Sequence, residues 1–161
     1  MPALEATKAK LPDFTYQRCL LGATLGEVEY VDGRDETSLY DRAAVGPKVS
    51  APMLTLDSLL AREVIPPPSF MKLDVQGYEL EILKGGQRAL GAAQAVLLEV
   101  NVYHLSPEMP VVLDVLNYMD ANGFFWFDIL GLLRRSADDA MSHMDFLFLR
   151  RDHPLFRDSW R

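Results

Sequence analysis

The stretch FMKLDVQGYELEILKGG, residues 70–86, decides the fold class of this chain. Residues 70–75 form a short apolar run of strand length, and the run reaches a carboxylate at Asp74. Residues 76–84 have helix-forming composition, and the glycine pair that follows can adopt the left-handed conformation in which helices often end. The stretch therefore predicts a strand that leads directly into a helix, with an aspartate at the junction.

Similar patterns place further elements on both sides of this stretch. Residues 54–64 begin extended and turn helical at Asp57 or Ser58, either of which can cap a helix, and the prolines at 66–68 end it. Residues 34–50 are polar and interrupted by glycine and proline, which is typical of a loop. Helices are also expected over residues 3–10, 87–93 and 110–123, strands over residues 14–21, 26–31, 95–100, 124–131 and 144–151, and a turn at 32–33.

The run AVLLEV, residues 95–100, is the clearest indication of the fold class. A continuous apolar strand is typical of a sheet that is covered by helices on both faces. From residue 54 onward the order is helix, strand, helix, strand, helix, strand, strand. We therefore predict an α/β layered sheet whose last two strands, joined by the polar loop 132–143, form an antiparallel end.

The composition limits the classes of function. With 161 residues, 49% of them hydrophobic, the chain can bury one core, so we expect a single domain over residues 1–161. The net charge is −7 and basic residues never run longer than a pair, so we expect no nucleic acid and no membrane partner. Cys19 is the single cysteine, which fits a reducing cytoplasm. Residues 123–133 are strongly apolar but too short to span a bilayer.

Residues 72–85 read K-x-D-x-x-G-x-E-x-x-x-L-x-G. This run resembles the signature of the FkbM-type methyltransferases, which are S-adenosylmethionine-dependent enzymes with the class I methyltransferase fold. The flanking segments resemble the same family in order and spacing: CLLGATLGEVEYV, LTLDSLL, AVLLEV, GFFWFDILG and MDFLFLRRDHPLF. The resemblance covers nearly the whole chain.

The resemblance implies a partial Rossmann-like class I sheet, mostly parallel with an antiparallel C-terminal strand and with helices on both faces. The family's chain normally begins with a strand, a glycine-rich turn and a second strand that ends in an acidic residue. We find neither here, so we expect the chain to hold the C-terminal two-thirds of the family domain and to lack about 60 residues of cofactor-binding segment. A start that is internal to a longer reading frame is the other interpretation.

Several residues are candidate cofactor contacts. By the resemblance, Asp74 lies between the reactive sulfur of S-adenosylmethionine and the acceptor, where it can orient a hydroxyl or offset the positive sulfonium. Its alternative role is to cap the following helix. Gly77 lets the backbone pass close to a ligand or a strand. The family packs the adenine edge where this chain has Leu20 and Gly22, and Glu79 either faces the cleft as a substrate contact or interacts with the helix dipole.

The next strand supplies further candidates. Glu99 and Asn101 lie at its end and are expected to bind substrate, and His104 is the candidate general base because histidine titrates near neutral pH without tuning. The oxygen atoms of Asp74, Glu99 and Asn101 suit a divalent metal, but the spacing is not that of a metal motif, so we expect none. Lys72 is expected to pair with a carboxylate such as Asp74 or Glu99.

Two functions follow from the resemblance. The first is O-methylation of a small molecule or a sugar hydroxyl by S-adenosylmethionine. The second is a truncated, non-catalytic domain that acts as a binding module or is completed by another chain. Because the family's first two strands lie beside residues 70–75, that strand is expected to have an exposed edge. We expect the strand over 14–21 to move there, or a homodimer or partner chain to cover it.

Overall fold

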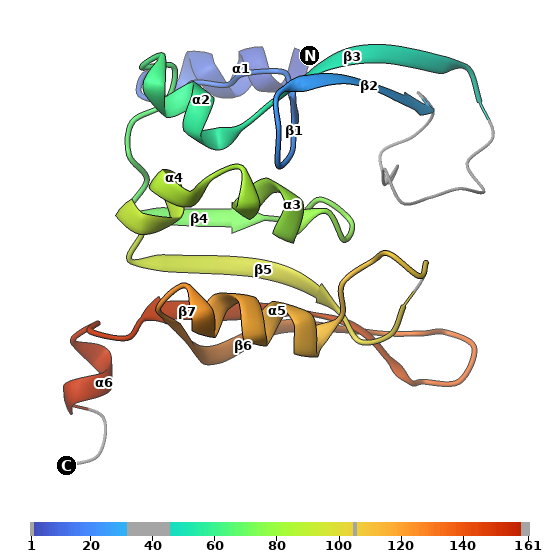
Figure 1. The fold of residues 1–161 in the computed structure, drawn as a ribbon, viewed down its shortest axis with the longest axis vertical. Coiled ribbons are helices and arrows are strands. Elements are labelled where there is room, and N and C mark those ends of the chain that lie inside the picture. The colour runs from blue at the N-terminus through green and yellow to red at the C-terminus, as the bar shows by residue number, and fades with distance from the viewer. Residues whose placement is uncertain (1, 32–45, 105, 159–161) are drawn as a thin grey trace.

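The computed structural model describes residues 2–31, 46–104 and 106–158 (Figure 1). The helices are α1 (Pro2–Lys10), α2 (Leu56–Ala61), α3 (Glu79–Lys84), α4 (Gln87–Ala92), α5 (Val112–Ala121) and α6 (Leu155–Asp158). The strands are β1 (Leu20–Leu21), β2 (Gly26–Val31), β3 (Lys48–Leu54), β4 (Phe70–Leu73), β5 (Ala95–Asn101), β6 (Phe124–Arg134) and β7 (Met141–Arg150). None of these helices is long and apolar enough to cross a membrane.

The strands form two mixed sheets within the described residues. A three-stranded sheet has the order β1-β3-β2, and a four-stranded sheet has the order β4-β5-β7-β6. The pairs β1–β3 and β4–β5 are parallel, whereas β2–β3, β5–β7 and β6–β7 are antiparallel. The α/β class is confirmed, but the expectation of a mostly parallel sheet is wrong, because the long β6–β7 hairpin brings two antiparallel pairs into the larger sheet.

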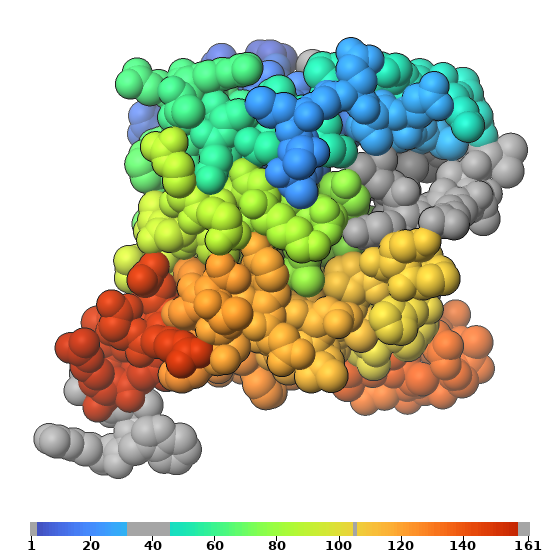
Figure 2. Space-filling view, viewed as in Figure 1, coloured from blue at the N-terminus to red at the C-terminus, as the bar shows by residue number. Residues whose placement is uncertain are grey.

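Helices α3, α4 and α5 pack on one face of the larger sheet (Figure 1). The core on that face contains Leu83 of α3, Leu90 of α4 and Met119 of α5, all buried against Val96 and Leu98 of β5. Figure 2 shows the same face closed by the atoms of these helices.

The opposite face of the larger sheet carries residues that alternate with this core. Leu97 and Leu147 are cross-strand neighbours there, and Phe70 and Leu133 are each 53% exposed. The β5 sequence predicts helices on both faces, whereas in the described residues this face carries exposed apolar side chains. The aromatic ring of Phe156 in α6 does contact Phe125 and Phe127 of β6 edge-on.

The strand predicted over residues 14–21 is much shorter than expected. Only Leu20 and Leu21 pair, and they pair with Met53 and Leu54 of β3. This strand does not move to β4, whose hydrogen-bonded neighbour among the described residues is β5. That expectation is wrong because β3, part of which had been predicted as loop, offers β1 a partner instead. The predicted turn at 32–33 lies outside the described residues.

The N-terminus of α2 is capped by Thr55, whose hydroxyl accepts a hydrogen bond of 3.0 Å from the Ser58 N–H. Asp57 has a different role from the one predicted. Its carboxylate accepts hydrogen bonds of 3.0 Å from the N–H groups of Arg88 and Ala89, so it caps α4. This capping interaction joins α2, which follows the smaller sheet, to a helix of the larger one.

Candidate functional site

Polar side chains gather where β4 and β5 end. Leu73 pairs with Leu98, so Asp74, the next residue after β4, lies beside Glu99 of β5. Across the sheet in the other direction, β7 starts next to the end of β5 and pairs His143 with Asn101. The carboxyl end of the parallel pair therefore brings side chains from three strands to one edge, which is where ligands bind in open α/β sheets.

These side chains form one hydrogen-bonded chain, which we call the polar cluster: Lys72, Asp74, Gln76, Glu99 and His143. The Lys72 Nζ lies 3.0 Å from Asp74 Oδ2. The Gln76 amide nitrogen lies 3.5 Å from Asp74 Oδ1 and 3.1 Å from Glu99 Oε2. The His143 Nε2 lies 3.1 Å from Glu99 Oε1. The expected pairing of Lys72 with a carboxylate is confirmed.

Negative charge is in excess around Glu99. Its side chain is 12% exposed, and burial raises the pKa of its carboxyl, with the charges of Asp74 and Glu79 adding to the rise and His143 opposing it. The pKa of Lys72 is raised by its hydrogen bond to Asp74 and by the nearby carboxylates. The cluster therefore favours a positive charge close to it.

Glu79 supports the turn between β4 and α3. It is 2% exposed, and its Oε1 accepts hydrogen bonds from the N–H groups of Val75 at 3.0 Å and Gly77 at 3.2 Å. Burial raises the pKa of its carboxyl even though these backbone bonds lower it. Glu79 thus holds the backbone of the signature turn through both of these hydrogen bonds.

The same turn contains two residues in the left-handed region. Gln76 has φ +55° and Gly77 has φ +94°. A Cβ at Gly77 would lie 2.7 Å from Cγ of Met109, a buried residue that closes over the turn. Glycine is required here for both reasons. The consequence of the turn is that the Gln76 amide bridges Asp74 and Glu99.

The remaining candidate site residues lie outside the polar cluster. Asn101 is buried at the end of β5, opposite His143. His104 is exposed and its Nδ1 lies 2.8 Å from the Met109 carbonyl oxygen, so it secures the segment after β5. Leu20 and Gly22 belong to the smaller sheet, where Gly22 is buried against the Met53 side chain and the Gly85 backbone. The structure thus brings Asp74, Gly77, Glu79 and Glu99 together, and it places Leu20 and Gly22 elsewhere.

Two members of the polar cluster were missed from the sequence. The contacts of Gln76 cannot be predicted from the sequence, because they depend on a left-handed backbone conformation that a non-glycine residue rarely adopts. His143 had been given no role. Successive side chains of β7 alternate between the two faces of the sheet, so His143 and Asp145 lie on the same face. Once the register of β5 and β7 is known, this alternation places both of them on the face that carries Glu99.

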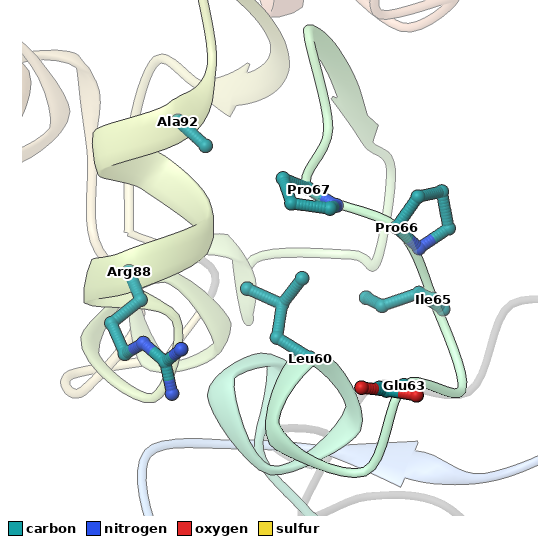
Figure 3. Close-up of a pocket in the computed structure, with 7 residues that line it drawn as sticks. All are labelled: Leu60, Glu63, Ile65, Pro66, Pro67, Arg88 and Ala92. Atoms are coloured by element: carbon teal, nitrogen blue, oxygen red, sulfur yellow. The ribbon is translucent and has the colours of Figure 1, made fainter.

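The described residues also include a pocket away from the polar cluster. No group of three or more His, Cys, Asp or Glu side chains there is placed to hold a metal ion. A pocket of about 540 Å³ lies between α2 and α4 (Figure 3), and none of the polar cluster lines it. Its walls are Leu60, Glu63, Ile65, Pro66, Pro67, Arg88 and Ala92.

Comparison with known proteins gives one match. The family model described as the methyltransferase FkbM domain matches residues 7–125, a range that includes the signature stretch, β5 and α5. No curated protein and no solved structure matches the chain significantly.

Proposed function

The chain belongs to the FkbM methyltransferase family, and we propose that it transfers a methyl group from S-adenosylmethionine to a hydroxyl oxygen of a small molecule or sugar. The observation that carries this proposal is the polar cluster: the signature aspartate, Asp74, is joined through Gln76 to Glu99 at the carboxyl end of the sheet.

The residues fit S-adenosylmethionine at its sulfonium end. Asp74, Glu99 and Asp145 lie close enough to Lys72 to raise its pKa, and this lysine is their counterion on β4. A cationic ligand gains from such an excess of carboxylate. The nucleoside end has less support, because the space beside Gly22 is filled by Met53 and that beside Gly77 by Met109. The roles of Leu20, Gly22 and Gly77 in cofactor binding remain predictions.

When bound, S-adenosylmethionine supplies an electrophilic methyl group whose bond to sulfur breaks with its electron pair left on the sulfur. The chain's own residues have separate tasks. Asp74 balances positive charge, and Glu79 fixes the turn that carries Gln76. Such reactions depend mainly on the positioning of the two reactants, so the rigidity of this turn matters for rate.

Transfer of a labelled methyl group tests the proposal. The protein is incubated with methyl-labelled S-adenosylmethionine and a panel of methyl glycosides, and the label in each glycoside is measured beside that from Asp74→Asn. We expect label in at least one glycoside and about a hundredfold less with the variant. Equal labelling by the wild type and by Asp74→Asn would contradict the role of Asp74, and an unlabelled panel would contradict the sugar as acceptor.

A binding module is the second candidate, and the exposed apolar face of the larger sheet favours it. Phe70, Phe125, Phe127 and Leu133 are all at least 40% exposed. Exposed apolar side chains on a sheet are typical of an association site. We propose a second copy of the chain as its occupant. Light scattering at increasing protein concentration tests this: a dimer mass for the wild type and a monomer mass for Phe70→Ser are expected, and a monomer at all concentrations would contradict it.

A further inference from the structure

The interaction between His143 and Glu99 defines which imidazole nitrogen carries hydrogen. A carboxylate only accepts hydrogen bonds, so Nε2, 3.1 Å from Glu99 Oε1, is the protonated nitrogen in the neutral ring. Nδ1 is then the nitrogen with the free electron pair. No hydrogen bond to Nδ1 occurs within the described residues, and the His143 side chain is 28% exposed.

Glu99 is held on both oxygens. Oε1 faces His143 and Oε2 accepts from the Gln76 amide at 3.1 Å. With both oxygens occupied and only 12% of the side chain exposed, Glu99 is suited to orient its neighbours rather than to take a proton from a ligand. A carboxylate that holds one imidazole nitrogen fixes the ring and leaves the other nitrogen directed away from it.

The other two histidines lack this arrangement. The Nδ1 of His104 is bonded to the Met109 carbonyl oxygen, and the Nδ1 of His153 accepts from the Leu155 N–H at 3.3 Å. No ion pair joins either of them to a carboxylate in the part of the chain that the structure describes. His143 alone combines a carboxylate partner with an unused nitrogen beside the signature turn.

We propose that His143, and not His104, is the general base, and that its Nδ1 takes the hydroxyl proton of the methyl acceptor while Glu99 positions the ring. This inference rests on the proposed function, because it presumes a hydroxyl acceptor. The O–H bond breaks, its electron pair stays on the acceptor oxygen, and an N–H bond forms at Nδ1. A positioned base of this kind typically contributes a factor of about 10² to 10⁴ in rate.

The charges on this face of the sheet suit an imidazolium. Glu99 comes from β5, Asp145 from β7 itself and Asp128 from β6, and the residues on β4 and just after it are Lys72 and Asp74. Glu99 and Asp145 are cross-strand neighbours on β5 and β7, Asp128 of β6 lies opposite Leu147, and Lys72 is already paired with Asp74. The positive charge that His143 gains in the step is therefore offset by its neighbours.

Diethyl pyrocarbonate tests the open nitrogen without any substrate. This reagent acylates an unprotonated, accessible imidazole nitrogen. Tryptic cleavage places the three histidines in separate peptides, residues 89–134, 136–150 and 152–157, so mass spectrometry reads each one. We expect His143 to be modified in the native protein near neutral pH. Protection of His143 in the native protein, with full modification after denaturation in urea, would overturn the proposal whether or not the cofactor binds.

Chemical rescue tests the proton transfer itself. With S-adenosylmethionine and the methyl glycoside that accepts label, His143→Ala should lower kcat about 10² to 10⁴ fold, and free imidazole should restore part of it. His153→Ala is the matched control and should retain activity. Calorimetry should give the same affinity for S-adenosylmethionine in the wild type and in His143→Ala. Unchanged kcat in His143→Ala, or a loss that imidazole does not restore, would contradict the base role.

Failure of this inference and failure of the proposed function give different results. If the wild type takes up no S-adenosylmethionine, the proposed function fails, and acylation still decides whether His143 has an open nitrogen. If the wild type transfers methyl groups and His143→Ala does so equally well, only the assignment of the base fails.

Discussion

Gly22 and Gly85 bring the smaller sheet, just after β1, into direct backbone contact with the end of α3. A Cβ on Gly85 would overlap the carbonyl oxygen of Gly22, and the Gly85 carbonyl itself accepts a hydrogen bond of 3.1 Å from the Asp57 N–H. A backbone neighbour cannot move aside as a flexible side chain can. The glycine that ends the signature stretch therefore serves the docking of the smaller sheet as well as the end of α3.

Gly85→Ala should destabilise the protein by about 1 to 3 kcal/mol, because the added methyl group forces the sheets apart. Gly91 is the matched control: it lies in α4, nothing approaches its Cβ position within 4 Å, and Gly91→Ala should stabilise by about 0.5 to 1 kcal/mol. Urea unfolding measures both. Equal effects of the two substitutions would contradict the contact.

As the cap of α4, Asp57 should contribute about 1 kcal/mol to the free energy of unfolding. Asp57→Ala leaves the N–H groups of Arg88 and Ala89 without their acceptor, so the free energy of unfolding should fall by that amount. Asp152→Ala removes a carboxylate whose ion pair with Arg150 is 3.6 Å long and exposed, and it should be nearly neutral. A similar small change in both variants would show that the cap contributes nothing.

Glu79 links stability to pH. Because burial raises the pKa of its carboxyl in the folded state, the folded protein binds a proton more readily than the unfolded chain, and the contribution of Glu79 to stability grows as pH falls through that raised pKa. Glu79→Gln cannot take up this proton. The stability of the wild type relative to Glu79→Gln should therefore rise as the pH is lowered from neutral toward 4.5, the ordinary pKa of a glutamate.

Glu79→Ala provides the comparison at neutral pH. It leaves the buried N–H groups of Val75 and Gly77 without an acceptor and should destabilise by about 1 to 3 kcal/mol, whereas Glu79→Gln keeps an acceptor oxygen and should cost much less. Thermal unfolding of the three proteins at both pH values measures the set. A fall in the stability of the wild type relative to Glu79→Gln as the pH is lowered would contradict the predicted pH dependence.

Asp74 should affect binding of the sulfonium cofactor more than binding of its demethylated product. Asp74→Asn removes the carboxylate and leaves Lys72 without its partner, so a sulfonium loses an attraction and meets a free ammonium group. Affinity for S-adenosylmethionine should fall about tenfold, which corresponds to ~1.4 kcal/mol. Affinity for S-adenosylhomocysteine, which lacks the sulfonium charge, should change little. Equal losses for both ligands would exclude charge as the reason.

The elements within the signature stretch were predictable because local pattern determines them. The apolar run before Asp74 gives β4, and the helix-forming run that ends at Gly85 gives α3. Likewise the alternation of polar and apolar residues over 26–31 gives β2. The boundaries differ by a few residues, since a strand ends where its pairing ends: β4 pairs with β5 only as far as Leu73.

The pairing of the strands was less predictable. The division into two sheets depends on β3, a seven-residue strand of which the part before residue 51 had been read as loop. The same limit applies to the site. His143 is close to Glu99 only through the antiparallel register of β5 and β7, and the sequence supplies no sign that β7 is the neighbour of β5. Asp74, Gly77 and Glu79 were found because their positions in one turn follow from sequence spacing.

Isothermal titration calorimetry of the wild-type chain with S-adenosylmethionine tests the central claim most directly, namely that the polar cluster at the end of β4 and β5 belongs to a methyl-transfer site. We predict saturable binding with a dissociation constant in the micromolar range and one site per chain. An absence of heat up to millimolar S-adenosylmethionine, with a folded protein verified by circular dichroism in the same sample, would contradict the claim.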